Sequence, residues 1–392
     1  MIRFNMLFYW ASALFLIACG TGRNISPQFI DDPVSRVDMN KVMLKGWKFN
    51  GYTESPVITV LEKVVYRLEK DNRLTLEVHQ VSKVMKDGQK GPGKSFIYFR
   101  DGYERVSKVE AYTITPDKKR VEATNIVTSR PFYNHMMKLD LYQDIKVMTI
   151  TMPRVRKGSL LSVRYQMELE YPDLKGVVEG EFYLANRYPI LTQKGVIIVP
   201  KGKKLRFTGI KTKLKPRKVS RGDMDYYVVE KENVRVVHSE PFQPAFQELS
   251  PRLAFTTLKD WGDMSKRVYA LLSTGLKSSD EVTKLANALC SEAKNKKEKV
   301  KILYNYVTDT RNISNAAIPL GMAGFHPTPS QFILKLGYAD AKDKAALLAN
   351  MLKAVGIESY LCLTNENYPI DSRVPSLKNM NRILLAVKLD GD

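Results

Sequence analysis

The pattern of hydrophobic and polar residues changes once along this chain. From about residue 58 to residue 246, apolar and polar residues alternate over short stretches, for example at 74–79 and at 161–171. Turn residues such as Asp87-Gly88 separate these stretches. Many short alternating strands at this spacing predict an all-β antiparallel sandwich, which we place at residues 56–250.

Beyond residue 250 the apolar residues recur with a helical period, as they do along 300–307. The sequence predicts helices at 278–290, 300–307 and 340–355, and strands at 358–364 and 383–387. Residues 251–392 are therefore expected to form a second, α+β domain.

The third of these predicted helices has clear start and stop signals. Asp340 is a good N-cap residue, and the carboxylate of Asp343 complements the positive end of the helix dipole. Gly356 suits the position just beyond the last turn. The residues expected on the buried face are Ala345, Leu348, Met351, Leu352 and Val355.

The composition is that of a globular protein. The chain has 392 residues, of which 44% are hydrophobic and 26% are charged. This length suffices for two domains with cores of their own. The composition excludes a largely disordered chain.

The first residues indicate export. Arg3 precedes an apolar run from Met6 to Ile17, which is short for a membrane span and typical of a signal peptide. The run ends in Leu-Ile-Ala-Cys, which resembles the lipobox of bacterial lipoproteins. The resemblance implies a signal peptide at 1–18 and a lipid on Cys19. A plain secretory signal with an incidental cysteine is the alternative.

Behind that anchor, residues 19–55 are expected to form a tether and an edge element, because their pattern is poorly periodic. Gly20 follows the predicted lipidation site, where an aspartate is often linked to inner-membrane retention. By this resemblance to known sorting signals, we expect the outer membrane, on its periplasmic or surface face.

The spacing of two further cysteines and four histidines does not indicate a metal site or a catalytic site. Cys290 continues the apolar face of a predicted helix, and Cys362 lies in a short apolar run. Packing is the favoured interpretation for both, ahead of a disulfide, a redox role or catalysis. The histidines lack the spacing of zinc ligands, so neither a metal site nor a cofactor is expected. They are His79, His135, His238 and His326.

The formal net charge of +21 is partly concentrated in one segment. Residues 203–221 hold nine Lys or Arg and no Asp or Glu. A solvated strand edge that discourages pairing is the favoured interpretation. The alternative is a patch for an anionic partner, such as lipid headgroups, phosphorylated sugars or acidic polysaccharide. Nucleic acid is not expected for an exported chain without a matching motif. The candidate patch residues are Lys211, Lys213, Lys215, Arg217 and Lys218.

Several motifs, taken in order, resemble one family. The carboxy-terminal part resembles the transglutaminase-like, papain-related cysteine hydrolases and acyltransferases. More narrowly, the chain resembles bacterial exported proteins in which an uncharacterised β-domain precedes such a domain. Only the block at 340–345 with its helix is specific alone. The motifs are PRVRKGSLL at 153–161, QELSP at 247–251, VKILYNYV at 300–307, PTP at 327–329, DAKDKA at 340–345 and MNRILL at 380–385.

The chemistry of that family needs a cysteine at a helix start, a histidine on a strand and a residue that orients the histidine. The family pattern places the cysteine at Ala341 and the histidine at Arg382. Alanine has no nucleophile, and arginine stays protonated and cannot act as a general base. The orienting aspartate is expected beyond a glycine turn, where this sequence stops at Gly391-Asp392. The resemblance thus implies a catalytically degenerate and carboxy-terminally short member.

Three functions are compatible with this pattern. The favoured hypothesis is a non-enzymatic envelope lipoprotein that binds or scaffolds an anionic polymer or a protein. The alternative is an active cysteine protease, amidase or acyltransferase with a relocated nucleophile, for which Cys362 and His326 are the candidates. A truncated, decayed gene product is the second alternative. A laboratory exchange of cysteine for alanine fits less well, because Arg382 departs from the pattern too.

Overall fold

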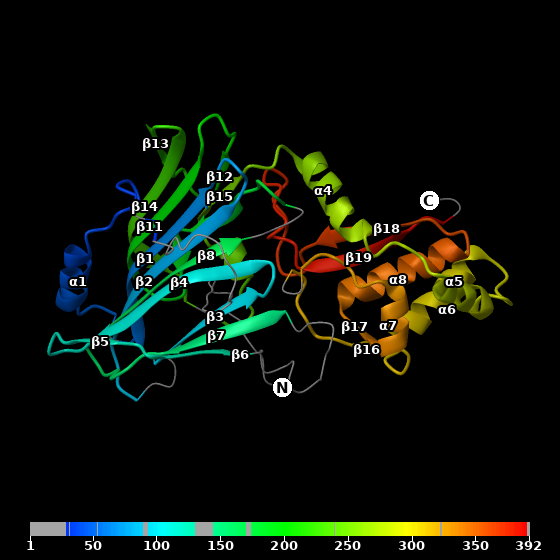
Figure 1. Ribbon diagram of the computed structural model, residues 1–392, viewed down its shortest axis with the longest axis horizontal. Coiled ribbons are helices and arrows are strands. Elements are labelled where there is room, and N and C mark those ends of the chain that lie inside the picture. The colour runs from blue at the N-terminus through cyan, green and yellow to red at the C-terminus, as the bar shows by residue number, and fades with distance from the viewer. Residues whose placement is uncertain are drawn as a thin grey trace, which may run out of the picture. The chain divides into compact units, whose positions relative to one another are not determined.

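A computed structural model describes residues 29–30, 32–52, 54–88, 93–129, 144–169, 174–238, 240–321 and 324–389. These residues form two compact units, one ending at Thr257 and one beginning at Leu258 (Figure 1). The predicted signal peptide, Cys19 and His135 lie outside the described residues, as do Gly391 and Asp392.

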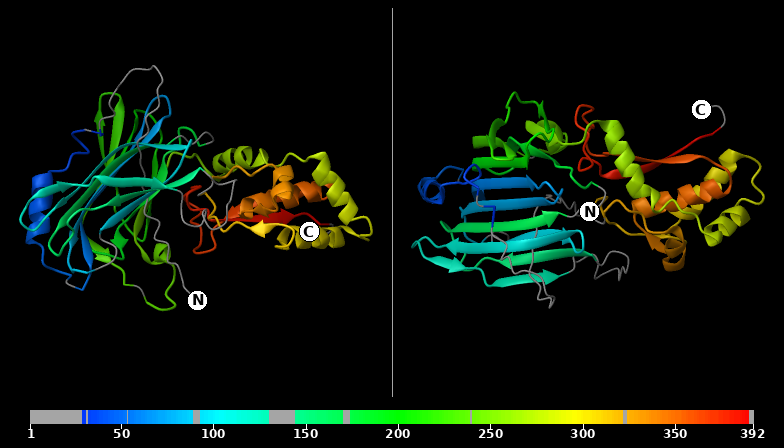
Figure 2. Two further views of the ribbon diagram at one scale, coloured as in Figure 1. Left: turned by 60° about the horizontal axis from the view of Figure 1, so that its bottom comes forward. Right: turned by 45° about the horizontal axis from the view of Figure 1, so that its top comes forward.

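Unit 1 contains a nine-stranded sheet with the order β10-β14-β11-β1-β2-β8-β4-β5, in which β13 also pairs with β14. The strands are β1 (Val57–Leu68), β2 (Leu74–Val84), β4 (Glu104–Ile114), β5 (Arg120–Glu122), β8 (Leu160–Leu169), β10 (Ala185–Asn186), β11 (Ile190–Pro200), β13 (Arg217–Arg221) and β14 (Met224–Val236). The strands lie side by side in Figure 2.

The sheet is mixed, which corrects the prediction of a purely antiparallel one. β1 runs parallel to β11, with Val65 opposite Val196, and β10 runs parallel to β14. The other pairs in this sheet are antiparallel. Alternation along one strand reports which face is buried and carries no information about the direction of a distant partner.

Two three-stranded sheets also belong to unit 1. One has the order β3-β7-β6 and the other β12-β15-β9. Their strands are β3 (Lys94–Arg100), β6 (Asn125–Ser129), β7 (Ile145–Thr151), β9 (Glu179–Tyr183), β12 (Arg206–Ile210) and β15 (Arg252–Thr256). Ile97 of β3 and Phe255 of β15 share one apolar core with Val163 and Tyr165 of the large sheet. The alternating residues of β8 thus face this core, as the sequence predicted.

The pairing of β15 explains where unit 1 ends. The sequence placed the domain boundary after residue 250, but Arg252–Thr256 pair with both β12 and β9. The short helix α3 (Phe246–Leu249) precedes this strand. The boundary therefore falls after Thr257, because a strand at the centre of a sheet belongs to the unit that contains its partners.

The amino-terminal segment covers the other face of the large sheet. Helix α1 (Met39–Lys48) is capped by Asp38 and packs on β1, inside the region predicted to be a tether. Ile30 and Val34 join an apolar cluster with β1, β11 and β14. The described residues of this region, including Ile30, Val34 and helix α1, are therefore part of unit 1.

A buried polar cluster crosses that same face. The Glu77 carboxylate accepts hydrogen bonds from Lys63 Nζ at 2.9 Å, from Arg164 Nη2 at 2.9 Å and from the Ile30 backbone N–H at 2.8 Å. His79 Nε2 lies 3.0 Å from Ser162 Oγ. Burial and the nearby cations Arg164 and Lys63 lower the pKa of His79 to about 3.

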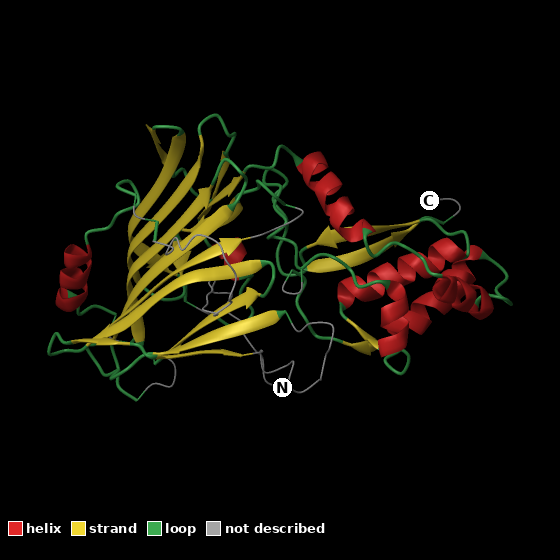
Figure 3. Cartoon of the chain, in the orientation of Figure 1, coloured by secondary structure: helices red, strands yellow, loops and turns green. Residues whose placement is uncertain are grey.

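Unit 2 contains five helices and two small two-stranded sheets among its described residues (Figure 3). They are α4 (Trp261–Ser273), α5 (Asp280–Leu289), α6 (Lys296–Thr308), α7 (Ser330–Leu336), α8 (Ala341–Ala354), β16 (Ser314–Asn315), β17 (Tyr338–Ala339), β18 (Ser359–Thr364) and β19 (Arg382–Val387). The helices and strands predicted in this half are confirmed, with small shifts of their ends.

Helix α8 lies at the centre of unit 2 and packs against α5, α6, α7 and both strands of the β18–β19 hairpin. Leu348 is 8% exposed and Met351 and Leu352 are fully buried, as predicted. Ala345 and Val355 are only partly buried, whereas Ala346 and Leu347 are fully buried. Other elements pack against the helix on several sides, so more of its residues are buried than the single apolar face predicted from the sequence.

Candidate functional site

The start of α8 is held by a network of buried charges. Asp340 Oδ1 accepts a hydrogen bond from the Asp343 backbone N–H at 3.0 Å, which confirms the predicted N-cap. Asp343 Oδ1 accepts a hydrogen bond from the Thr328 backbone N–H at 2.7 Å. Lys342 is 2% exposed and forms an ion pair with Asp340. Burial raises the pKa of Asp340, and the Lys342 charge opposes this shift.

Within this rigid frame, Ala341 is exposed at the first position of α8. The site therefore offers a helix N-terminus and solvent access, which are the features that activate a cysteine in this place. The side chain present is a methyl group, which can neither attack a carbonyl carbon nor hold a proton.

Arg382 opens β19 and pairs with Thr364 across the hairpin. Its guanidinium forms an ion pair with the Glu366 carboxylate at 2.8 Å, and both side chains are about half exposed. Leu385 and Val387 pack into the core around α8. Since side chains alternate along a strand, Arg382 belongs to the face opposite that core.

The two remaining cysteines differ in environment. Cys290 is 5% exposed, as predicted, and burial raises the pKa of its thiol. Cys362 is exposed, which corrects the prediction that it packs in a core. Among the described residues, the β18–β19 ribbon has two strands and α8 packs against it, and alternate residues along β18 are exposed.

The proposed relocated base lies in a loop. His326 Nδ1 is 3.4 Å from the Thr274 hydroxyl, while Cys362 Sγ contacts the Tyr360 carbonyl at 3.6 Å. Across the parts of the chain that the structure describes, no group of three or more His, Cys, Asp or Glu is arranged to hold a metal ion. In the same residues, no helix has the length and apolarity required to cross a bilayer.

The basic segment of unit 1 has a different structure from the one predicted. Lys211, Lys213 and Lys215 lie in the loop between β12 and β13, not on a strand. Lys211 has a φ of 54°, which is incompatible with an extended strand. The alternation of lysine with Thr212 and Leu214 therefore occurs in a loop, in which the lysines are exposed and the residues between them are partly buried.

Arg217 and Lys218 begin β13, and both are exposed. Lys218 Nζ forms an ion pair with Asp225 at 2.8 Å, and Ser220 Oγ donates to the same carboxylate at 2.6 Å. These contacts lower the pKa of Asp225, and the Asp225 carboxylate raises the pKa of Lys218. Lys218 is therefore held in place by a buried anion.

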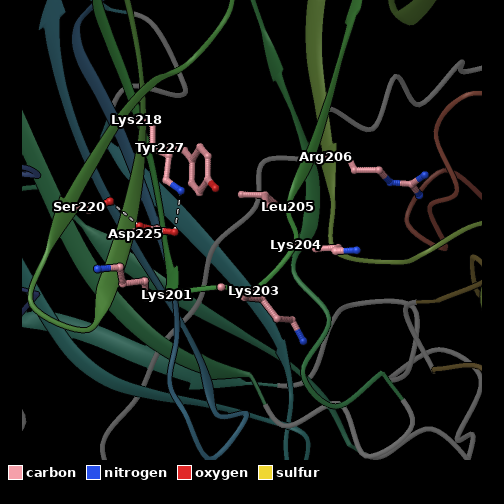
Figure 4. Close-up of a pocket in the computed structure, with 10 residues that line it drawn as sticks. Lys201, Lys203, Lys204, Leu205, Arg206, Lys218, Ser220, Asp225 and Tyr227 are labelled. Atoms are coloured by element: carbon pink, nitrogen blue, oxygen red, sulfur yellow. Dashed lines mark hydrogen bonds and ion pairs between the residues drawn. The ribbon is translucent and has the colours of Figure 1, made fainter.

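Lys218 borders an open groove of about 590 Å³ (Figure 4). The loop from β11 to β12 lines its other side, and this loop was not among the predicted site residues. Its cations could have been identified from the sequence, because the carboxylate-free run includes them. The groove is lined by Lys201, Gly202, Lys203, Lys204, Leu205, Arg206, Lys218, Ser220, Asp225 and Tyr227.

Comparisons with known proteins agree with these observations at the level of the fold. Residues 70–237 match a family described as a domain of unknown function with a solved structure (DUF3857). This range runs from just before β2 to just after β14, so it lies within unit 1. No curated protein matches the chain.

Among solved structures, the chain is similar to a candidate protease from Parabacteroides distasonis, with a TM-score of 0.74 and 22% sequence identity. The similarity covers 86% of this chain and 66% of that protein's length. An M1 zinc metallopeptidase from Deinococcus radiodurans aligns over 51% of this chain and 42% of its own, with 14% identity and a TM-score of 0.27. The first similarity shows a shared fold, and the second is too distant to support an argument.

Proposed function

We propose that this protein is a non-enzymatic envelope lipoprotein, in which a β-sandwich unit is followed by a transglutaminase-like unit that binds or scaffolds a partner. The proposal rests on Ala341 and Arg382, which stand where the family resemblance would place the nucleophile and the base. The similarity of fold to a candidate protease supports the architecture and does not extend to its activity.

The chemistry at these positions supports a binding role. Ala341 presents an exposed methyl group at the start of α8 and supplies no nucleophile. The Arg382 guanidinium stays charged and cannot accept a proton as a histidine would. Yet Asp340 and Asp343 keep the helix start ordered. A frame that is maintained without its reactive groups fits recognition better than turnover.

A thiol-labelling experiment tests this proposal. The purified protein is treated with iodoacetamide at pH 7, and the labelling rates of Cys290 and Cys362 are followed by mass spectrometry. We expect slow labelling of exposed Cys362, at the rate of a free cysteine, and protection of buried Cys290. Rapid, selective labelling together with amide hydrolysis that a Cys362→Ser variant abolishes would overturn the proposal.

The exposure of Cys362 favours one second candidate, an active cysteine hydrolase with a relocated nucleophile. A thiol on an open strand face is accessible to a substrate, which a core cysteine is not. For this candidate, His326→Gln should reduce hydrolysis as strongly as Cys362→Ser. Hydrolysis that is absent in all three proteins excludes it.

The lipid anchor belongs to the proposal as well. We infer that Cys19 carries the lipid and that the outer membrane holds the protein. Metabolic labelling with palmitate should mark the native chain and spare a Cys19→Ser variant. Equal labelling of both proteins, or of neither, contradicts the anchor without affecting the argument about Ala341.

A further inference from the structure

Residues 201–221 of unit 1, which include the outer strands β12 and β13 of two different sheets, carry an unusual concentration of positive charge. The segment holds ten Lys or Arg and no Asp or Glu. Six of the ten lie in loops, namely Lys201, Lys203, Lys204, Lys211, Lys213 and Lys215. We refer to residues 201–221 as the basic edge.

Protection of strand edges does not account for this concentration. Lysines discourage strand pairing when they stand on the edge strand itself. In the basic edge, β12 and β13 contribute only Arg206, Arg217, Lys218 and Arg221. The loop lysines repel one another without shielding a strand, and an anionic partner would relieve this repulsion.

Most of these loop lysines have no anion of their own. Lys201, Lys204, Lys213 and Lys215 are exposed, and none forms an ion pair within the described residues. The single carboxylate in the groove, Asp225, is buried and is occupied by Lys218 and Ser220. The exposed charges of the groove are therefore positive, whereas its carboxylate is buried and already bound.

The directions of the side chains indicate the kind of ligand. Figure 4 shows Lys201, Lys203 and Arg206 pointing away from one another instead of toward one point. A single small anion would need converging donors, whereas several anionic groups along an extended ligand would suit diverging ones. Tyr227 and Leu205 provide an apolar surface between these cations.

We propose that the basic edge binds a ligand that carries several phosphate groups. A lysine ammonium group acts as a point charge, so it favours ligands of high charge density. An arginine guanidinium instead recognises planar groups through two parallel hydrogen bonds. A phosphate monoester carries about 1.5–2 negative charges at neutral pH, against one for a carboxylate. Such phosphates occur both on lipid headgroups and on soluble molecules.

The test uses the full chain, with vesicles and a soluble polyanion as separate probes. Vesicles of phosphatidylcholine are compared with vesicles that also contain phosphatidic acid, whose headgroup is a phosphate monoester, so that any lipid anchor contributes equally to both. Polyphosphate is the soluble probe, and polygalacturonate is its carboxylate counterpart. The additional binding to anionic vesicles, relative to neutral ones, measures the contribution of the basic edge. Binding to neutral vesicles measures the contribution of the lipid anchor. The proposal for the basic edge and the proposal for the anchor are therefore tested independently.

Two matched variants assign the binding. The first replaces Lys201, Lys204, Lys213 and Lys215 with Gln and leaves the Lys218–Asp225 pair intact. The control replaces Lys266, Lys277, Lys284 and Lys301, four exposed lysines of unit 2, and changes the net charge equally. Affinity for a phosphate probe should fall about tenfold or more in the first variant and less than about threefold in the control.

Each outcome decides a part of the proposal. Binding to anionic vesicles alone identifies headgroups as the source of the phosphates, and binding to polyphosphate identifies a soluble ligand. Equal losses in both variants, or no phosphate-dependent binding at all, would overturn the proposal. Equal affinity for polygalacturonate would overturn the choice of phosphate. Unchanged thermal unfolding of the first variant excludes misfolding as the cause.

Discussion

At the scale of single residues, the burial of His79 makes the stability of the folded chain depend on pH. His79 is 8% exposed, contacts Ser162 and lies near two cations that the Glu77 carboxylate binds. Its pKa of about 3 in the folded chain is far below the ordinary value of 6.5. Below pH 6.5, His79 therefore binds a proton in the unfolded chain but stays neutral in the folded chain until the pH approaches 3.

This difference predicts a loss of stability as the pH falls from 6.5 towards 3. The contribution of His79 is fully present above pH 6.5, and between pH 6.5 and 4 the loss amounts to roughly 3 kcal/mol. A His79→Gln variant should lose correspondingly less over the same interval. Urea unfolding at several pH values, followed by tryptophan fluorescence, measures the difference.

The control for this prediction is His238→Gln, a change at an exposed histidine of the same unit. It should leave the pH dependence of the wild type in place. If wild type and His79→Gln have parallel stability curves from pH 6.5 to pH 4, then His79 is protonated inside the folded chain.

At the scale of elements, α8 should stabilise unit 2 through its buried face. Replacing Leu348 with Ala removes buried methyl groups and should lower the free energy of unfolding by about 2–5 kcal/mol. Ala341→Cys, at an exposed position of the same helix, should change it by less than about 0.5 kcal/mol. Thermal and chemical unfolding of the full chain check both values.

A Leu384→Ala variant serves as the matched control, because Leu384 is 54% exposed on the hairpin. Its effect should be small although the same atoms are removed. If Leu348→Ala is as mild as Leu384→Ala, the core around α8 is not the main support of unit 2.

Local patterns in the sequence predicted α8 well, because its cap, apolar period and terminal glycine are all short-range signals. The same holds for β18 and β19. The parallel pairing of β1 with β11 could not be predicted, because it joins residues about 130 positions apart whose alternation is identical in either direction. Cys362 shows a further limit, because an apolar run does not reveal that only one face of its ribbon is covered.

The candidate sites divide in the same way. Ala341 and Arg382 could be placed on a helix start and a strand start, because motif and periodicity agreed there. The burial of Lys342 between two carboxylates could not be predicted, since a lysine near a helix start is ordinarily solvated. The groove beside Lys218 needed the proximity of the β11–β12 loop to strands β13 and β14, which only the tertiary structure supplies.

At the scale of the whole molecule, each unit has apolar cores of its own. Leu61 lies in a core of unit 1 with α1, β1 and β2, and Leu348 lies in the core of unit 2. Because these cores share no residues, we expect the units to open as separate cooperative blocks.

Hydrogen exchange followed by mass spectrometry tests this expectation in the full chain. Leu61→Ala should speed the exchange of the slowest amides of unit 1 roughly 30-fold or more, if its cost is at least about 2 kcal/mol, and leave unit 2 unchanged. Leu348→Ala should have the reverse pattern. Faster exchange in both units after either change would mean that the two units unfold together, which would contradict the expectation. Separate responses would mean that each unit is stabilised by its own core, so that a substitution in one unit leaves the stability of the other unchanged.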